Sequence, residues 1–293
     1  MKILFVGSVR FSLSCLTHLV QLNSEIVGIC TSPNSRRNSD HQDLSNFCQE
    51  KNIPWIYTDD INSDETYTWI QERLPDVIFC FGWSRLLKQR ILDFPRLGVI
   101  GYHPSALPEN RGNNPLIWAL ALGLNKTAST FFVMDAGTDS GPIVSQREIL
   151  ITDQDDASSL YNKMTEVALQ QIETFLPGLN SGTIISVEQN TGKANRWRKR
   201  GHPDGVIDWR MSATTIHNLV RGLTKPYVGA QFTAKEQEIR LWRTQLVSNS
   251  PQNIEPGKVI GFIDNQPVIK CGEGAICLIS IDPQIPFREG DYL

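Results

Sequence analysis

Two ionisable residues, His103 and Asp139, lie where a chain often carries out chemistry. His103 closely follows an apolar run that includes Val99 and Ile100, and Asp139 lies in a glycine-flanked turn directly after the apolar run 130–134. If both runs are strands of one sheet, both side chains lie at its carboxyl edge, where open α/β sheets bind ligands. An imidazole can accept and later release a proton near neutral pH, and a carboxylate can orient the ring and stabilise the imidazolium. The pair therefore predicts acid–base catalysis, with His103 also a candidate donor to a tetrahedral oxyanion.

The loop that follows His103 is restricted by proline. A histidine at a strand end and an aspartate in a glycine-rich turn usually have structural roles, so neither residue alone predicts a site. Pro104, Pro108 and Pro115 limit the backbone of this loop, and low conformational entropy suits the positioning of a reacting group. Arg111, in the same loop, is a candidate for binding an anionic group of a substrate.

Length and composition indicate a soluble protein of about two domains. The chain has 293 residues and a formal net charge of −3, so it can bury a full core and lacks the basic excess typical of nucleic-acid-binding proteins. Its start carries no basic leader before an apolar stretch, and no apolar run is long enough to cross a bilayer. We therefore expect a cytoplasmic protein with neither a nucleic-acid nor a membrane partner.

The cysteines give no sign of a metal or redox site. The chain has six of them, none at the two-residue spacing of metal or redox motifs, and most lie in apolar runs. Buried thiols are therefore favoured over disulfides or zinc ligands, and no metal is predicted.

The first half of the chain alternates short β-branched or aromatic runs with helical patterns. This alternation is typical of βαβ units and a parallel sheet, and continuous apolar runs fit a sheet covered on both faces. We therefore expect an α/β domain with a mostly parallel sheet over residues 1–180, which positions His103 and Asp139. The predicted strands are residues 3–6, 26–31, 76–81, 98–102 and 130–134.

Three helices have clear start or stop signals. Pro115 occupies the first-turn position of a helix over residues 116–122. Ser84 can cap a helix over residues 84–92. Asp155 or Asp156 can cap a later helix, which Pro177 is expected to stop.

The composition changes after the first domain. Residues 181–204 are polar and predict a linker. Residues 205–293 show short alternating runs punctuated by glycines, which predicts a smaller, mostly-β carboxyl-terminal domain that resembles an open barrel.

Gly7, directly after the first strand, invites comparison with a dinucleotide-binding fingerprint. That fingerprint needs two further glycines so that the backbone can approach a pyrophosphate, and the following residues lack them. A structural turn is therefore favoured. The alternative is an anionic substrate group held at the start of the next helix, with Arg10 beside it.

Two segments carry a resemblance to a known family. Residues 99–112 resemble the His-Pro-Ser-Leu-Leu-Pro-x-x-Arg-Gly motif of the folate-dependent formyltransferases, and residues 134–141 resemble their Met-Asp-x-Gly-x-Asp-Thr-Gly motif. The similarity also includes the opening strand, the turn 81–88 and the Ile-Asp-Trp of residues 207–209. The resemblance implies transfer of a formyl group from 10-formyltetrahydrofolate to an amine, without a metal, on a Rossmann-like domain followed by a smaller β-rich domain.

The same resemblance implies where the folate binds. Family members hold the pterin along the strand-to-helix turn that matches residues 81–87, and Leu86 and Leu87 match best. An ordinary core role is the alternative for these two side chains, because apolar residues line pockets of this kind in any case. The implied folate-binding residues are Phe81, Trp83, Leu86, Leu87 and Asp135.

One position departs from the family pattern. The family usually carries an asparagine two residues before the histidine, where it polarises the formyl oxygen, and this chain has Gly101 there. Removing one such donor typically costs about 10² to 10³ in rate. Asn113 and Asn114, or Asn110, could supply a donor, a bound water could fill the space, or the two later asparagines could simply cap the helix that begins near Pro115.

The acceptor amine stays open between three hypotheses. Residues 113–119 and 200–209 resemble the sugar-nucleotide N-formyltransferases most, which implies an amino-dideoxy sugar linked to a nucleotide as acceptor, and the protein could form a homodimer. Methionyl-tRNA formyltransferase is the second hypothesis, although that enzyme resembles a longer chain with a basic insertion where residues 31–42 hold only two arginines. The third is a non-catalytic folate- or nucleotide-binding protein. Hydrolysis of the formyl-folate also stays open, and glycinamide ribonucleotide formyltransferase is disfavoured because such chains lack a second domain.

A basic cluster bears on this choice. Phosphate neutralisation by a sizeable positive surface supplies most non-specific affinity for a polyanion. The one such cluster lies in the predicted linker, where a solvated loop is the usual explanation and contact with a single diphosphate the alternative. Its members are Lys193, Arg196, Arg198, Lys199 and Arg200.

Overall fold

The computed structural model describes residues 1–34 and 38–293. By their contacts they form two compact units. The first comprises Met1–Pro115, Thr127–Ile149 and Asn162–Trp197, and the second Leu116–Lys126, Leu150–Tyr161 and Arg198–Leu293. The predicted linker is thus shared between the units, and the domain boundaries expected from the sequence stay a prediction.

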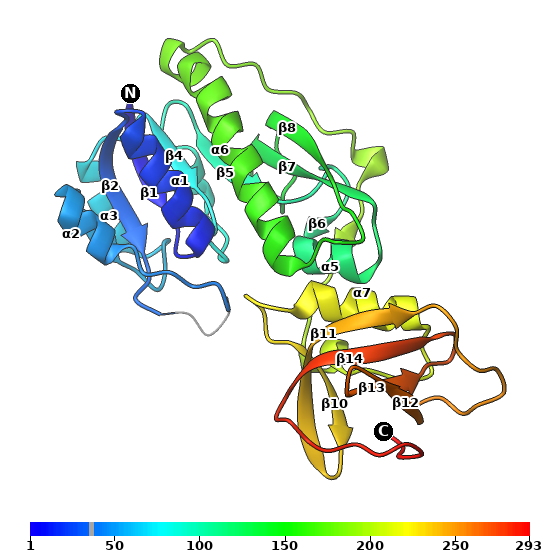
Figure 1. The fold of residues 1–293 in the computed structure, drawn as a ribbon. Coiled ribbons are helices and arrows are strands. Elements are labelled where there is room, and N and C mark those ends of the chain that lie inside the picture. The colour runs from blue at the N-terminus through cyan, green and yellow to red at the C-terminus, as the bar shows by residue number, and fades with distance from the viewer. Residues whose placement is uncertain (35–37) are drawn as a thin grey trace. The chain divides into compact units, whose positions relative to one another are not determined.

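The first unit is built on a seven-stranded sheet (Figure 1). Its strands are β1 (Lys2–Val6), β2 (Glu25–Thr31), β3 (Trp55–Tyr57), β4 (Val77–Cys80), β5 (Val99–His103), β7 (Lys126–Val133) and β8 (Ile143–Leu150). Their order is β3-β2-β1-β4-β5-β7-β8. Neighbouring strands in the series β3-β2-β1-β4-β5 pair in parallel, and β7 runs antiparallel to β5. The Rossmann-like, mostly parallel sheet is therefore confirmed.

All five predicted strands are present, and the sequence patterns missed β3 and β8. The first of these is only three residues long. The second, β8, has no regular alternation of apolar and polar side chains, and most of its residues are exposed or half-buried. Neither therefore carries the apolar run that marks a buried strand.

Helices flank this sheet, and one of them contributes to an aromatic core (Figure 1). They are α1 (Arg10–Gln21), α2 (Ser45–Lys51), α3 (Asp64–Glu72), α4 (Gln89–Leu92) and most of α6 (Ala157–Ser181). Phe175 of α6 lies 5.0 Å from Phe131 and 6.4 Å from Phe79, measured between ring centroids. Such ring pairs fix the helix over the strands whose carboxyl ends carry the predicted site.

The predicted helix over residues 84–92 is wrong in its first half. Only Gln89–Leu92 is helical, and residues 84–88 form a loop. Asn62 explains the difference: its side chain donates to the Leu86 carbonyl at 2.9 Å and accepts from the Lys88 N–H at 2.6 Å. These two backbone groups are thereby satisfied outside a helix.

Pro177 does not stop α6, which continues to Ser181. Proline removes one backbone hydrogen bond and crowds the preceding turn. Here Pro177 is exposed, while Leu176 and Leu179 on either side are buried. Burial of these leucines outweighs the local cost, which is why the helix persists.

The expected linker is more ordered than its polar composition suggests. Arg196–Trp197 forms a short strand, β9, which pairs in parallel with β6 (Arg111–Gly112) in the loop after His103. Gln189, in the same segment, is buried. Two 3-10 turns, η1 (Thr191–Lys193) and η2 (His202–Gly205), complete the segment. Polarity here reflects hydrogen bonding to the site loops and not a free chain.

The second unit is small and mostly β, as predicted. It consists of a five-stranded sheet in the order β10-β11-β14-β13-β12, whose neighbours are all antiparallel, with the amphipathic helix α7 packed on it. Ile117, from α5, joins its buried core. The elements are α5 (Pro115–Ala121), α7 (Ala213–Leu223), β10 (Ala230–Ala234), β11 (Gln237–Val247), β12 (Val259–Ile263), β13 (Gln266–Lys270) and β14 (Ala275–Asp282).

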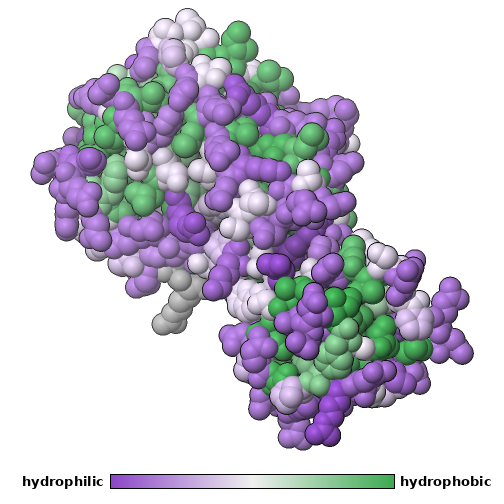
Figure 2. Space-filling view, viewed as in Figure 1, coloured by the Kyte–Doolittle hydropathy of each residue, from purple (hydrophilic) through white to green (hydrophobic). Residues whose placement is uncertain are grey.

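The visible surface is dominated by hydrophilic side chains, with smaller apolar areas between them (Figure 2). Within the described residues, no helix has the length and apolar character needed to cross a membrane. This agrees with the absence of a long apolar run in the sequence.

Candidate active site

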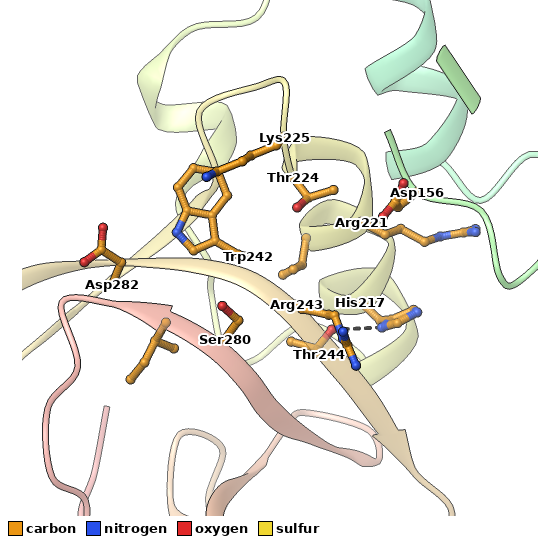
Figure 3. A pocket seen from close by; sticks show the side chains of 12 residues that line it. Asp156, His217, Arg221, Thr224, Lys225, Trp242, Arg243, Thr244, Ser280 and Asp282 are labelled. Carbon is orange, nitrogen blue, oxygen red and sulfur yellow. Dashed lines mark hydrogen bonds between the residues drawn. The ribbon is translucent and has the colours of Figure 1, made fainter. Parts of the chain in front are cut away.

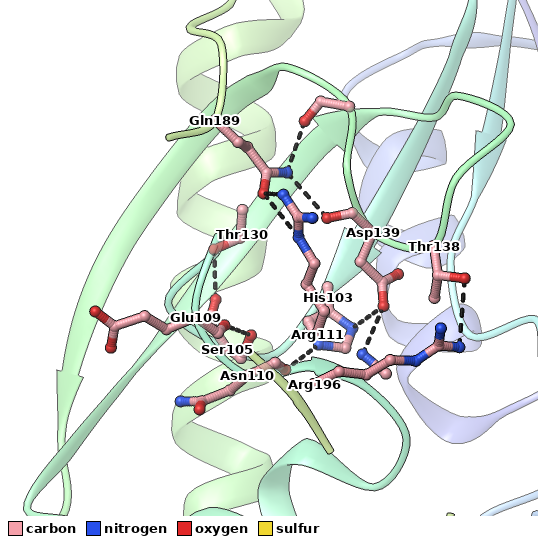
Figure 4. A network of polar contacts seen from close by, with 12 residues as sticks. His103, Ser105, Glu109, Asn110, Arg111, Thr130, Thr138, Asp139, Gln189 and Arg196 are labelled. Carbon is pink, nitrogen blue, oxygen red and sulfur yellow. Dashed lines mark hydrogen bonds and ion pairs between the residues drawn. The ribbon is translucent and has the colours of Figure 1, made fainter. Parts of the chain in front are cut away.

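His103 is the last residue of β5, at the carboxyl edge of the parallel strands. Its side chain is only 7% exposed. The imidazole Nε2 lies 2.9 Å from the backbone carbonyl oxygen of Asn110, in the loop that follows (Figure 4). The ring is thus held by its own loop, a contact that the sequence could not reveal because it involves a backbone group.

Asp139 faces His103 from the turn after β7, so the predicted proximity is observed. The predicted route is wrong, because β7 runs antiparallel to β5 and its last residue, Val133, pairs with Ile100 and not with the end of β5. One carboxylate oxygen lies 3.7 Å from Nδ1 of His103 and accepts the Gly112 N–H at 2.9 Å. Asp139 has a left-handed backbone conformation, with φ of 52°. The distance to Nδ1 allows electrostatic stabilisation of an imidazolium but is too long for a hydrogen bond. The Asn110 carbonyl therefore orients the His103 ring, and not Asp139 as expected.

Gln189 ties the Asp139 turn to the loop after His103. Its amide nitrogen donates to the carbonyls of Asp139 and Gly141, at 3.0 Å and 2.7 Å. Its amide oxygen accepts two hydrogen bonds from the Arg111 guanidinium, at 2.6 Å and 3.2 Å (Figure 4). Nothing in the sequence pattern singled out Gln189, because its role depends on contacts 48 to 78 residues away.

Met134 lies where a side chain at position 101 would begin. A Cβ built on Gly101 would lie 2.7 Å from Cγ of Met134 and 3.0 Å from Cζ of Phe132. Both distances are shorter than ordinary contacts between carbon atoms. Protein atoms therefore crowd the position where a Cβ at residue 101 would lie. The replacement of the missing donor by a bound water stays a prediction.

The asparagines expected to replace that donor lie in the loop before α5. Asn113 and Asn114 are exposed, and the Asn113 N–H donates to the Trp197 carbonyl. Asn114 has a left-handed backbone with φ of 53°. Their part as oxyanion donors stays a prediction.

The two arginines expected to bind substrate differ in their surroundings. The Arg111 guanidinium is directed to Gln189, so it stabilises the loop in this structure. Arg10 begins α1, is exposed, and donates its backbone N–H to the Asp40 carbonyl. Substrate binding by either stays a prediction, and of the two Arg10 has the more accessible side chain.

The residues expected to hold folate divide by burial. Phe81 is fully buried, and its carbonyl accepts the Ser12 hydroxyl at 2.6 Å. Leu87 is 6% exposed and packs in the core with half-buried Trp83, whereas Leu86 is 65% exposed. Leu86 is therefore the most exposed of these apolar side chains.

Asp135 closes the turn that carries Asp139. Its carboxylate accepts from the Gly137 N–H at 3.0 Å and from the Ser140 hydroxyl at 2.8 Å. These bonds give Asp135 a structural role, and contact with folate stays a prediction.

The thiols and the described carboxylates show no metal or redox centre. All six cysteines are free and buried. Burial raises the pKa of Cys80 and of Cys271 to about 12. Among the described residues, no group of histidine, cysteine and acidic side chains could hold a metal ion.

A cavity of about 600 Å³ lies within the second unit (Figure 3). Arg221, Lys225 and Arg243 line it together with Asp156 and Asp282, so its charges largely balance. None of the residues predicted for formyl transfer lines this cavity.

Comparison with known proteins gives the family. The chain matches the model of formyl transferases over residues 1–175 and that of the formyl transferase C-terminal domain over residues 201–285. A methionyl-tRNA formyltransferase of Geobacter metallireducens is 29% identical over 280 residues, which cover 94% of this chain and 89% of that protein.

Two solved structures show the same fold. WlaRD, a sugar 3N-formyl transferase crystallised with dTDP and 5-N-formyl-THF, aligns with a TM-score of 0.72 at 16% identity, over 97% of this chain and 99% of its own. A methionyl-tRNA formyltransferase from Clostridium thermocellum aligns with a TM-score of 0.64 at 17% identity, over 85% of this chain and 95% of its own. With both of its domains matched, this chain belongs to the formyl transferase family and is a folate-dependent N-formyltransferase.

Proposed function

We propose that the protein transfers the formyl group of 10-formyltetrahydrofolate to the amino group of a nucleotide-linked amino-dideoxy sugar. The observation that carries formyl transfer is the buried His103 with the Asp139 carboxylate 3.7 Å away. The acceptor class is supported by the likeness to WlaRD, which extends over nearly the whole of both chains.

The first step needs a base. An amine at neutral pH is mostly protonated and must lose a proton before its nitrogen can bond to the formyl carbon. Solvent water takes that first proton. As the new C–N bond forms, the attacking nitrogen becomes acidic and His103 takes its second proton, while the facing Asp139 carboxylate stabilises the resulting imidazolium. The formyl oxygen becomes an oxyanion, and an N–H of the imidazolium or of the loop donates to it.

The second step needs an acid. The tetrahedral intermediate collapses when the bond from carbon to the folate nitrogen breaks. His103 returns its proton to that nitrogen, so the products are the N-formylated amine and tetrahydrofolate, and the enzyme regains its starting charge. One imidazole therefore serves both steps.

The basic cluster is largely engaged within the protein, which disfavours a polyanionic acceptor. Arg198 forms an ion pair with Asp204, and Arg200 donates to the carbonyl of the same residue. Both guanidinium groups also lie over the ring of Trp118, at 5.3 Å and 4.5 Å from its centroid. The two arginines of the segment 31–42, at positions 36 and 37, lie outside the described residues.

Methionyl-tRNA is the second candidate acceptor. The observation that favours it is the 29% identity to a methionyl-tRNA formyltransferase over 94% of the chain. A tRNA complex depends on many phosphate contacts, so its affinity falls steeply with salt, whereas a diphosphate releases few counterions.

A product assay tests the acceptor directly. The purified protein is incubated with 10-formyltetrahydrofolate and either methionyl-tRNA, a panel of nucleotide-linked amino sugars, or no amine. We expect formylation of one amino sugar, with activity that persists at salt concentrations that dissociate tRNA complexes. Higher activity on methionyl-tRNA than on every sugar would reject the sugar, and tetrahydrofolate released without any amine would indicate hydrolysis.

A further inference from the structure

Asn195 is attached to the loop that holds His103. Its side-chain oxygen accepts the backbone N–H of Asn110, and its amide nitrogen donates to the Asn110 side-chain oxygen at 3.1 Å. The next two residues then pair with Arg111–Gly112 as β9 with β6. Asn195, 85 residues later in the chain, therefore holds both the backbone and the side chain of Asn110.

Asn110 is held in an unfavourable backbone conformation. Its φ is 63°, in the left-handed region, which costs an L-residue roughly 1 to 2 kcal/mol although asparagine tolerates it better than most residues. In this conformation its carbonyl oxygen lies 2.9 Å from Nε2 of His103. The hydrogen bonds from Asn195 stabilise the conformation that aims the carbonyl at the ring.

This contact determines which ring nitrogen carries the proton. A carbonyl oxygen only accepts hydrogen bonds, so Nε2 must donate and carries the hydrogen in the neutral ring. Nδ1 then carries the lone pair, and it faces Asp139 at 3.7 Å, beyond hydrogen-bonding distance. The basic nitrogen is thus left unblocked on the side of the carboxylate.

We propose that Asn195 is a positioning residue that, through Asn110, fixes neutral His103 as the Nε2–H tautomer and makes Nδ1 the atom that accepts the amine proton. The part of this inference that concerns proton transfer rests on the proposed function. The part that concerns the tautomer does not, because it follows from hydrogen bonding alone.

Nitrogen NMR reads the tautomer without any substrate. Protonated and unprotonated imidazole nitrogens have well-separated ¹⁵N shifts, and the chain has five histidines, so a His103→Gln spectrum assigns the signals of His103. At pH about 8.5, above the ordinary imidazole pKa of about 6.5, we expect a protonated Nε2 and an unprotonated Nδ1. In Asn195→Ala both shifts should move toward the average of two exchanging tautomers.

Kinetics supply the second readout. Asn195 is exposed, so its replacement opens no cavity. Asn195→Ala should lower kcat by about 10- to 100-fold, as expected when a reacting group loses its positioning, with unchanged folate affinity. Asn195→Asp keeps an acceptor for the Asn110 N–H, so its kcat should lie between those of the wild type and Asn195→Ala. Asn190→Ala, which removes only the local hydrogen bond to the Gly192 N–H in the same segment, is the matched control and should behave as wild type.

Each outcome decides the inference. A hydrogen on Nδ1 in the wild-type spectrum, or a tautomer unaltered in Asn195→Ala, would overturn it. If the wild-type protein formylates no amine, the proposed function fails while the spectra still decide the tautomer. If Asn190→Ala disturbs the His103 shifts as much as Asn195→Ala does, the effect belongs to the whole segment and the specific role of Asn195 is rejected.

Discussion

Met134 fills the space beside Gly101: its Cγ lies 2.7 Å from where a Cβ at position 101 would stand. Gly101 lies in the middle of β5 and Met134 lies just after β7, and these two strands pair with each other. In this structure, a side chain at position 101 would therefore require Met134 to move.

Gly101→Asn should destabilise the protein by about 1 to 3 kcal/mol, the usual cost of forcing extra atoms into a packed core. Met134→Ala should relieve the clash, so the double variant should be more stable than the sum of the two single changes predicts. Urea unfolding of the four proteins measures this coupling. Strict additivity would mean that Met134 does not exclude a side chain at position 101.

His103→Ala should lower turnover by about 10² to 10⁴ with little change in folate affinity, because a proton shuttle acts mainly in the transition state. Steady-state kinetics and folate titration of the same preparation separate the two effects. Weaker folate binding at unchanged turnover would assign His103 to binding and not to proton transfer.

Asp139→Asn should lower turnover by about 10²-fold, less than the roughly 10⁴ lost where a carboxylate is bonded directly to the catalytic histidine. The smaller effect follows from the 3.7 Å separation, and the amide oxygen can still accept the Gly112 N–H. The fold should therefore be retained. Wild-type turnover in this variant would leave Asp139 as a turn residue only.

Gln189→Ala should lower the free energy of unfolding by roughly 1 to 3 kcal/mol, because it leaves the carbonyls of Asp139 and Gly141 without their donor. Thermal unfolding measures the change. Gln170→Ala is a suitable control, since that residue is exposed and its side-chain oxygen accepts from a surface arginine, Arg147. Equal melting temperatures for the two variants would contradict a clamping role.

Asp204 should make stability depend on pH. Hydrogen bonds from the Arg198 side chain, and then from the Gly201 N–H, hold the pKa of this carboxyl well below its ordinary value. A lowered pKa in the folded state contributes stability that is present above the unfolded value of about 4 and lost as the pH falls through the folded value. The difference in unfolding free energy between wild type and Asp204→Asn should therefore be constant from about pH 5 to 8 and shrink below about pH 4. A difference of the same size at about pH 3 would disprove the linkage.

The sequence by itself determined the class of fold, because the apolar runs of β1, β4 and β5 are local patterns that a covered parallel sheet requires. It also predicted that His103 and Asp139 lie close together, because the glycine- and proline-rich motif around each residue is a local pattern. The helix over 84–92 and the stop at Pro177 were mispredicted, since Asn62 and the buried Leu179 act through contacts that no local window contains.

Only the tertiary structure decided what holds His103 and Asp139 in place. The Asn110 carbonyl, the side chains of Asn195 and Gln189, and the packing of Met134 on Gly101 each join positions far apart in the chain or use a backbone atom. Backbone carbonyls are the same in every residue, so residue type cannot reveal which of them will face an imidazole. That is settled by the left-handed backbone at Asn110, to which the distant Asn195 is hydrogen-bonded.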